Sequence, residues 1–294
     1  MTPWLALVNP YAAQGRRATP RVEAALQKRG ISGDVLEVDG IATLKDTVAM
    51  AASAERNRFV AVGGDGTVNA VLNALLEHEW QEPPILGVLP AGTGCDLLRT
   101  FGIGNRIESA ADSLAGETTY PVDVGLAIGE WGRRFFLNVS SAGATAAAAL
   151  ASIRLPGWLG TLRYVGGVAG SLPRFRRCDI SLEAGGRSFT GESLAVVFAN
   201  GQFFGGGFNI APRASMVDQL LDVQVITARK REVGRLMSKA RGGHHLSDRA
   251  VRRFVASEVR LETDEPWPVE TDGEPIGTTP VLLRTQAGRI RLKI

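Results

Sequence analysis

The sequence Arg58-Phe59-Val60-Ala61-Val62-Gly63-Gly64-Asp65-Gly66-Thr67-Val68-Asn69 joins a short apolar run to a cluster of glycines that contains a carboxylate. The apolar residues 59–62 predict a buried strand, and residues 70–77 carry apolar side chains at helical spacing. Glycine adopts positive φ and lets a ligand approach the backbone with no Cβ in the way. The start of a helix adds N–H groups without intrahelical partners and a positive dipole end. This order of strand, glycine turn and helix therefore indicates a phosphate-binding turn.

Two well-known phosphate-binding fingerprints do not fit this turn. The dinucleotide fingerprint requires a third glycine where Asn69 stands, and the P-loop requires a lysine that is absent here. A glycine cluster alone is equally compatible with a tight structural turn. Asp65 favours the phosphate interpretation, because an acid in such a turn makes sense when a metal ion accompanies the phosphate.

The composition excludes several classes of protein. The 294 residues suffice for two domains, and 45% are apolar, so a sizeable core can form. The net charge of +3 suits anionic substrates or membrane surfaces but is too small to indicate nucleic acid. Two cysteines, Cys95 and Cys178, imply no disulfide framework and a reducing cytoplasm. No signal peptide and no run of 18 apolar residues is present, so we expect no membrane-spanning segment.

Strands and helices alternate along the first half of the chain. The predicted strands are 4–8, 34–38, 59–62, 85–89 and 120–124, and the predicted helices between the first four are 20–29, 44–54 and 70–77. This alternation predicts a parallel sheet flanked by helices. Ligands of such sheets bind beyond the carboxyl ends of the strands. Asn9, residues 63–67 and residues 90–96 all follow strands directly, so we expect them to gather at one edge.

A second glycine loop, Pro90-Ala91-Gly92-Thr93-Gly94-Cys95-Asp96, again leads from a strand through glycines and an acid into a helix. Taken alone, Asp96 is equally explained as a helix N-cap. Two such loops at one sheet edge, each with an acid, favour a metal–nucleotide site over two independent turns.

Beyond Gly125 the pattern changes to short strands separated by turns, which predicts an antiparallel sheet domain. We place the domain boundary there, giving domains 1–125 and 126–294. The strands predicted in the second domain are 134–139, 180–184, 187–190, 193–199, 221–226, 259–263, 268–271, 281–284 and 289–294. Helical stretches near 142–152, 160–171 and 230–239 interrupt them.

Several motifs, in order along nearly the whole chain, resemble the diacylglycerol-kinase catalytic-domain superfamily, which includes bacterial soluble lipid kinases and sphingosine and ceramide kinases. In the first half the similar segments are Asn9-Pro10, 63–69 and 89–96. In the second half they are Gly160-Thr161-Leu162-Arg163-Tyr164, residues 200–207, Ala211-Pro212-Arg213-Ala214 and Thr271-Asp272-Gly273-Glu274-Pro275. The first glycine motif is shared with NAD kinases and phosphofructokinases, whereas the whole set is far more specific.

The resemblance implies a cytoplasmic enzyme, peripheral at the inner membrane surface, that transfers the γ-phosphoryl group of ATP to a lipid hydroxyl with the help of Mg²⁺. It implies a nucleotide-binding α/β domain and a β-rich antiparallel sandwich domain, with the active site in the cleft between them. A homodimer is one alternative for the oligomeric state. A kinase for a soluble acceptor such as NAD, and a nucleotide-binding protein with weakened catalysis, remain alternatives for the function.

The same resemblance assigns roles to individual residues. The positions that match nucleotide-binding residues are Asn9, Gly63, Gly64, Asp65, Gly66, Thr67, Val68, Asn69, Gly92 and Thr93. The acids that match ligands of a catalytic Mg²⁺, bound through water, are Asp65, Asp96 and Asp123. Asp272 matches the general base, with Glu274 beside it, and a structural Mg²⁺ would be held by the Asp218 carboxylate and the backbone carbonyls of Ser215 and Leu220.

The sequence departs from the family pattern at a few of these positions. Cys95 stands where the family usually has Asn, and Ala70 stands where it has an acid. Val217 and Gln219 flank Asp218 where a polar residue and a glycine are usual, so the structural metal site is the less secure of the two. From the residues alone, Asp272-Gly273 is equally typical of a two-residue hairpin turn.

A basic stretch, Arg229-Lys230-Arg231 followed by Arg235, Lys239 and Arg241, lies outside these motifs. Its ordinary interpretation is a solvated helix face. The alternative is a contact with anionic lipid headgroups.

Overall fold

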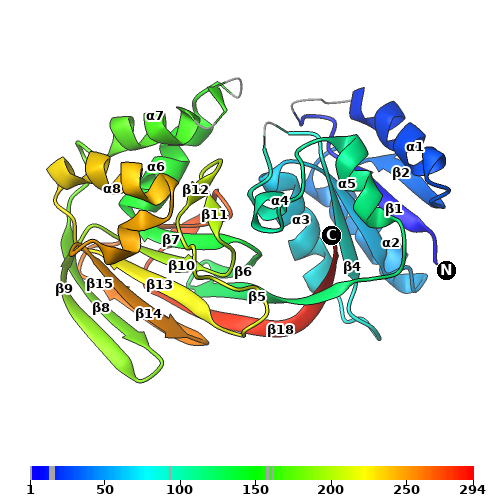
Figure 1. The fold of residues 1–294 in the computed structure, drawn as a ribbon. Helices are drawn as coiled ribbons and strands as arrows, with labels where there is room; N and C mark the ends of the chain where they lie inside the picture. Colours follow the sequence, from blue (N-terminus) through cyan, green and yellow to red (C-terminus); the bar gives the residue numbers. More distant parts are fainter. Residues whose placement is uncertain (1, 13–16, 93, 157–158, 161) are drawn as a thin grey trace. The chain divides into compact units, whose positions relative to one another are not determined.

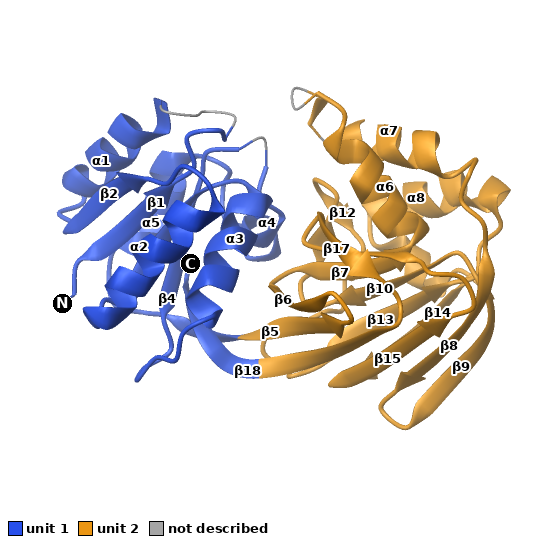
Figure 2. Cartoon of the chain, turned by 180° about the vertical axis from the view of Figure 1, so that it is seen from behind, with its two compact units in different colours: residues 1–122, 287–294 blue, residues 123–286 orange. Residues whose placement is uncertain are grey.

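The structure is a computed structural model that describes residues 2–12, 17–92, 94–156, 159–160 and 162–294. The chain divides into two compact units (Figure 2). Residues 1–122 and 287–294 form the first unit, and Asp123–Gln286 form the second.

The first unit is a parallel sheet covered by helices, as the sequence predicted (Figure 1). Its strands pair in the order β2-β1-β3-β4-β18, and every pairing in this series is parallel. In chain order its elements are β1 (Trp4–Val8), α1 (Ala18–Lys28), β2 (Gly33–Glu37), α2 (Ile41–Ser53), β3 (Arg58–Gly63), α3 (Asp65–Leu76), β4 (Ile85–Pro90), α4 (Asp96–Thr100) and α5 (Ile107–Leu114).

The continuous apolar runs of the first unit form strands because helices bury both of their faces. Val60, Val62 and Leu89 pack against apolar residues of α1 and α5. In α1 the buried residues recur at helical spacing, for example Val22 and Leu26. The buried central strands hold the loops at their carboxyl ends on a rigid base.

The second unit consists of antiparallel strands with three helices on one side (Figure 1). Its six-stranded sheet has the order β14-β13-β10-β7-β16-β17, and a second series has the order β18-β15-β8-β9. The elements are β5 (Tyr120–Gly129), β6 (Gly132–Phe136), β7 (Val139–Gly143), α6 (Ala144–Ile153), α7 (Leu162–Ser171), β8 (Cys178–Ala184), β9 (Arg187–Ser193), β10 (Ala195–Ala199), β11 (Phe203–Phe204), β12 (Phe208–Asn209), β13 (Leu221–Ile226), η3 (Lys230–Glu232), α8 (Val233–Arg241), η4 (His244–Ser247), β14 (Val251–Ala256), β15 (Glu258–Thr263), β16 (Pro268–Thr271), β17 (Glu274–Thr278) and β18 (Val281–Lys293).

Alternate residues of the six-stranded sheet enter two different cores. Val196 and Phe198 of β10 pack against Leu261 and Leu283 of the second series of strands. The intervening Val197 faces the helical layer, which contributes Leu236 of α8. This alternation is the pattern of a sheet buried on both faces, and it fixes the register of every central strand.

The strand β18 differs from the sequence analysis. The two strands expected at 281–284 and 289–294 form one continuous strand, even though Gly288 within it has φ of +64°. Its first part pairs with β15, and Arg291–Lys293 pair with β4 of the first unit. Residues 287–294 therefore complete the sheet of the first unit, although the sequence analysis grouped them with the second domain. Local patterns do not reveal which sheet a strand joins.

Candidate functional site

The loops at the carboxyl ends of β1, β3 and β4 meet in the first unit, as expected. Asn9 Nδ2 donates to Thr67 Oγ1 at 3.0 Å, and the Asn9 backbone N–H donates to Val62 O at 3.1 Å. The Ala91 N–H donates to Gly63 O at 3.0 Å. These bonds connect the loop after β1 to the first glycine turn, and that turn to the second glycine loop.

The packing of the chain requires glycine at some positions of these loops but not at others. A Cβ on Gly63 would lie 2.2 Å from Thr67 Oγ1, and one on Gly92 would lie 2.9 Å from Gly64 Cα. Both contacts are closer than packed atoms tolerate, so Gly63 is explained by Thr67 within its own turn and Gly92 by the close approach of the two loops. Gly64 is different, because its backbone is extended and the nearest described atom to an added Cβ is 3.6 Å away.

Asp65 and Asp96 each lie in the first turn of a helix, and they connect the two loops. Asp65 Oδ1 accepts the backbone N–H of Asp96 at 2.8 Å, and Arg99 Nε lies 3.3 Å from Asp96 Oδ1. Burial, followed by the negative charge of Asp65, raises the pKa of the Cys95 thiol between them, so this thiol stays protonated. The loops therefore present neighbouring carboxylates, which are the oxygen donors that Mg²⁺ prefers.

The other residues that were predicted to bind the nucleotide do not all lie at the turn. Val68 and Asn69 lie within α3 with buried side chains, and Asn69 Oδ1 accepts from Asn73 Nδ2 at 3.2 Å. Their side chains pack inside the unit, whereas Gly63, Gly64 and Thr67 lie at the turn itself. Thr93 lies outside the described residues.

Asp272 occupies a two-residue turn in the hairpin of β16 and β17. Asp272 and Gly273 have φ of +48° and +88°, and Thr271 pairs with Glu274 across the turn. This is the conformation of an Asp-Gly hairpin, so the structural interpretation of the motif is confirmed. Glu274 begins β17 and is exposed.

The Asp272 carboxylate is directed toward the backbone of residues 137–139. Its oxygens accept the backbone N–H groups of Leu137, Asn138 and Val139 at 2.9, 2.9 and 3.1 Å. These hydrogen bonds fix the orientation of the carboxylate. The same loop is bound from another side by Asn200, whose Nδ2 donates to Leu137 O at 2.7 Å and to Asp123 O at 3.0 Å. Two of the sequence motifs of the second unit, 200–207 and 271–275, thus converge on residues 137–139.

Glu270, two residues before Asp272, was missed by the sequence analysis. It is fully buried, and its carboxyl accepts hydrogen bonds from Ser141 Oγ at 2.6 Å and from the Gly273 N–H at 2.7 Å. Burial raises the pKa of Glu270 to about 8, and the charges of Asp272 and Glu274 act in the same direction. An acid in the middle of an otherwise buried predicted strand was the available signal.

Asp123 and Asp218 are brought together by a tight turn in the second unit. The Asp123 N–H donates to Met216 O at 2.6 Å, and Asp123 Oδ2 accepts the Gln219 N–H at 2.6 Å. Asp218 Oδ1 accepts the Leu220 N–H at 3.0 Å. Burial raises the pKa of Asp123, and the nearby negative charge of Asp218 adds to this effect. The acids assigned to the catalytic Mg²⁺ therefore come from both units, with Asp65 and Asp96 in the first and Asp123 in the second.

Within the described residues, no three His, Cys, Asp or Glu side chains lie close enough to hold a metal ion by themselves. Mg²⁺ commonly keeps several waters and binds one or two carboxylates together with substrate phosphates. The paired loops of Asp65 and Asp96 fit that mode of binding rather than a cage made of protein ligands.

An apolar cavity of about 80 Å³ lies between the six-stranded sheet and the helical layer of the second unit. Phe204 and Phe208 line it, and the ring of Tyr164 lies 5.2 and 5.7 Å from theirs. Burial and the charge of Glu270 raise the pKa of Tyr164, which stays neutral. His245 also lines the cavity, and burial lowers its pKa, so the imidazole is neutral and lies 2.9 Å from Gln224 Oε1.

Comparisons with known proteins agree with this division of the chain. Residues 3–127 match the diacylglycerol kinase catalytic domain, and residues 138–294 match the YegS C-terminal NAD kinase beta sandwich-like domain. A diacylglycerol kinase of Bacillus subtilis is 30% identical over 78% of this chain and 75% of its own length. A protein of Xanthomonas oryzae described as a YegS-like lipid kinase is 30% identical over 92% of this chain and 89% of its own length.

Solved structures show the same fold. A crystal structure of a diacylglycerol kinase from Bacillus anthracis superposes with a TM-score of 0.75 at 23% identity, covering 99% of this chain and 96% of that one. Another from the same strain gives a TM-score of 0.81 at 24% identity with the same coverage.

The two-unit fold, with acidic glycine loops in one unit and the Asp-Gly-Glu hairpin in the other, is that of a kinase that acts on lipids. The chain belongs to the diacylglycerol kinase family. No helix in the described part of the chain is both long enough and apolar enough to cross a membrane.

Proposed function

We propose that this lipid kinase uses ATP and Mg²⁺ to phosphorylate the hydroxyl group of diacylglycerol or a related lipid. The observation that carries the proposal is the hydrogen bond that joins the two glycine loops through Asp65 and Asp96. It places neighbouring carboxylates beside backbone N–H groups at helix starts, which is the combination that a metal-bound phosphate chain requires.

In this proposal the nucleotide is held by the loops at the carboxyl ends of β1, β3 and β4. The groups that would contact the nucleotide here are the backbone of Gly63 and Gly64, the Thr67 hydroxyl and the Asn9 amide. Gly64 supports the assignment, because no described neighbour requires a glycine there, whereas a phosphate close to the backbone would.

Asp65, Asp96 and Asp123 would hold Mg²⁺ through water. When bound, this ion neutralises charge on the phosphates during transfer. A second Mg²⁺ at Ser215, Asp218 and Leu220 remains a prediction. The turn described above supports it, because it holds Asp218 beside the Leu220 backbone.

Asp272 is proposed as the general base for the lipid hydroxyl, with Glu274 beside it. The three N–H groups of Leu137, Asn138 and Val139 support this role in one respect, because they hold the carboxylate in one orientation. The expected contribution is that of positioning the lipid hydroxyl and accepting its proton.

The second unit supports a lipid acceptor. Its cavity is lined by aliphatic and aromatic side chains, including Phe204, Phe208 and Tyr164, which suit an acyl chain rather than a nucleotide. We place the enzyme in the cytoplasm, peripheral at the inner membrane surface. A homodimer stays a hypothesis, which light scattering on the purified protein can test.

The experiment that tests the function offers the purified protein labelled ATP with Mg²⁺ and either mixed lipids in detergent micelles or NAD. We expect label in a chloroform-soluble product and none in NADP. Label in NADP would overturn the lipid acceptor. Bound ATP with label in neither product would favour a nucleotide-binding protein with weakened catalysis. Purified diacylglycerol, phosphatidylglycerol and a sphingoid base, assayed separately, would then identify the substrate.

A further inference from the structure

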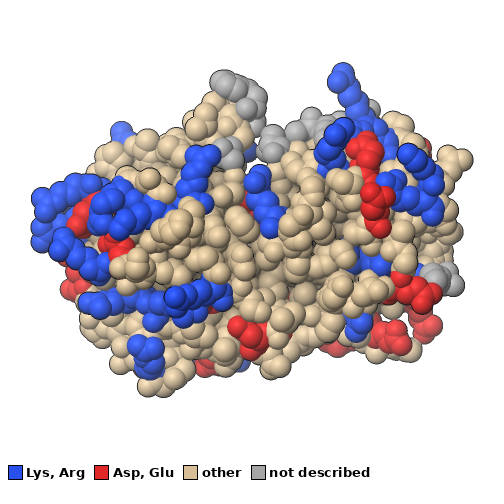
Figure 3. All heavy atoms as spheres, viewed as in Figure 1, with Lys and Arg blue, Asp and Glu red and all other residues tan. Residues whose placement is uncertain are grey.

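Positive charge is concentrated in one segment of the second unit. Residues 229–253 carry nine Lys and Arg against two Asp and Glu, a net charge of +7. The other 269 residues carry 24 Lys and Arg against 28 Asp and Glu, a net charge of −4. The small positive net charge of the whole chain is therefore the sum of one strongly basic segment and a weakly acidic remainder. On the face that contains α8, Lys and Arg gather over and around this helix (Figure 3).

A second basic segment adjoins the first. Lys230 Nζ donates to Pro173 O at 2.8 Å, and Arg177 donates to Thr227 O at 3.2 Å. These bonds place residues 174–177, which include three arginines and no acid, beside the start of η3. We call residues 229–241, which include η3 and α8, and residues 174–177 the basic surface.

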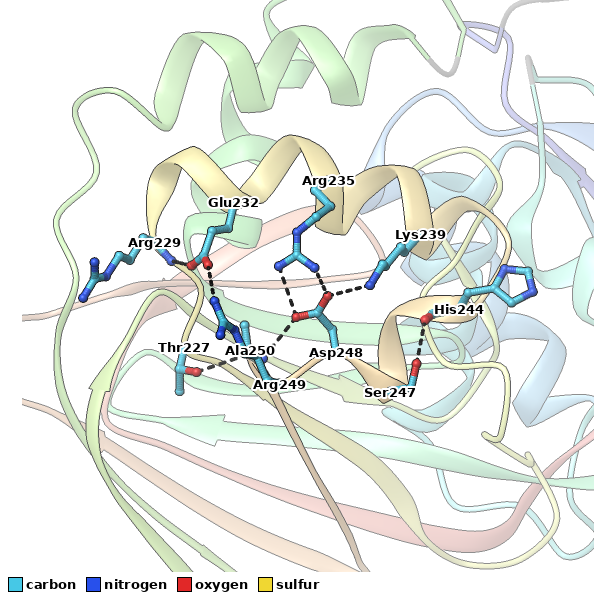
Figure 4. Close-up of polar contacts among 10 residues, drawn as sticks. All are labelled: Thr227, Arg229, Glu232, Arg235, Lys239, His244, Ser247, Asp248, Arg249 and Ala250. Atoms are coloured by element: carbon cyan, nitrogen blue, oxygen red, sulfur yellow. Dashed lines mark hydrogen bonds and ion pairs between the residues drawn. The ribbon is translucent and has the colours of Figure 1, made fainter.

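The two acids of the segment hold α8 in place rather than neutralise its exposed side (Figure 4). Asp248 is buried and accepts from Arg235 and from Lys239, the latter at 2.8 Å. The hydrogen bond from Lys239, together with Arg235, holds the pKa of Asp248 far below its ordinary value, so this acid is always charged. Glu232 accepts the Arg229 N–H at 2.8 Å at the start of the helical segment.

In the part of the chain that the structure describes, three arginines of residues 229–241 remain directed to solvent without an ion pair. Arg229, Arg231 and Arg241 are exposed, and among the described residues none of them forms an ion pair. Their guanidinium groups are available for external phosphates, which arginine binds in a bidentate manner.

The opposite side of α8 is apolar and covers the cavity described above. Leu236 and Ala240 are buried, and both line the cavity together with Met237. This apolar side packs on the core of the second unit, so α8 presents its cationic side to an external partner.

We propose that the basic surface docks this kinase on anionic lipid bilayers, with Arg229, Arg231 and Arg241 binding headgroup phosphates. The proposal rests on the membrane-surface location proposed above. Each basic residue near an anionic membrane contributes about a fivefold factor in affinity, so loss of all three predicts a decrease of roughly a hundredfold. A nucleic acid would meet the same charges, but the acceptor proposed above is a lipid, so the bilayer is the partner that we propose.

The test uses the full chain and vesicles without ATP. The docking variant is Arg229→Gln/Arg231→Gln/Arg241→Gln. The control variant is Lys28→Gln/Arg106→Gln/Arg260→Gln, which changes the net charge equally at exposed positions elsewhere. Binding to vesicles of phosphatidylglycerol in phosphatidylcholine is measured by co-sedimentation, and thermal unfolding shows that both variants are folded.

We expect the wild type and the control variant to bind anionic vesicles alike, the docking variant to bind roughly a hundredfold more weakly, and binding to fall with added salt. Equal binding by both variants, or equal binding of the wild type to pure phosphatidylcholine, would overturn the proposal. So would tighter binding to duplex DNA or RNA than to vesicles. Kinase activity on micellar lipid is assayed in parallel, so a failure of the proposed function is seen separately from a failure of docking.

Discussion

Gly64 and Gly92 face each other where the two glycine loops meet, but the chain itself requires a glycine only at position 92. A Cβ at Gly92 would lie 2.9 Å from Gly64 Cα, whereas a Cβ at Gly64 would have its nearest described atom at 3.6 Å. We therefore expect Gly92→Ala to destabilise the protein by roughly 1–3 kcal/mol through overpacking. We expect Gly64→Ala to unfold like the wild type but to bind ATP at least about tenfold more weakly, equivalent to about 1.4 kcal/mol. Urea unfolding and ATP titration of both variants check this pair. Normal ATP binding by Gly64→Ala would assign the first turn a structural role.

Asp272 is expected to serve both the reaction and the fold, and the two roles can be separated. Asp272→Asn keeps one acceptor oxygen but turns an amide NH₂ toward backbone N–H donors, so a loss of stability of about 1–3 kcal/mol is expected. If Asp272 is also the base, turnover falls at least roughly a hundredfold while ATP binding persists. Turnover at saturating ATP is compared with the melting temperature. Lower stability with nearly normal turnover would leave Asp272 only its role in the turn.

At the scale of elements, the hairpin of β16 and β17 contains a buried acid that titrates in the physiological range. Glu270 accepts from Ser141 Oγ and from the Gly273 N–H, so it supports the turn that carries Asp272. Burial raises its pKa to about 8, compared with about 4.3 in an unfolded chain. Because the folded state then holds the proton more tightly, this group weakens the fold as the pH rises from about 4.3 to about 8.

Glu270→Gln removes this titration but can keep both hydrogen bonds, with the amide oxygen facing Gly273 and the NH₂ facing Ser141. We expect the stability of the wild type to decrease by a few kcal/mol relative to the variant between pH 5 and pH 8. Urea unfolding at several pH values measures the difference. Parallel stability curves for the two proteins would mean that Glu270 is not protonated in the fold.

The sequence predicted elements well where the pattern is local. The alternation of apolar runs and helical spacing identified the parallel sheet, and the strand ends correctly indicated which loops meet. Pairings in the second half depend on contacts between distant residues, so the order of β14, β13, β10, β7, β16 and β17 could not be foreseen. The direction of the Asp272 carboxylate could not be predicted for the same reason, because its partners lie more than 130 positions earlier.

At the scale of the whole molecule, positive charge is concentrated in one segment of the second unit, and the last residues of the chain return to the first unit. The basic stretch was visible in the sequence, but a solvated helix face and a membrane-docking surface have the same sequence pattern. The decisive observations needed the fold: Asp248 beneath α8, the adjacent residues 174–177, and the cavity behind the helix. Of the two departures from the family pattern, Cys95 is buried beside Asp65 and Asp96.

The shared strand β18 has a consequence for how the protein is made. Residues 291–293 complete the sheet beside β4, and Arg291 and Lys293 also bind the backbone and side chain of residues 118–119. The ribosome synthesises these residues roughly 200 positions after β4, which takes about 10–40 s at about 5–20 residues per second. Until then the β4 edge is open to pairing with another chain, so the nascent first unit is a natural client for a chaperone.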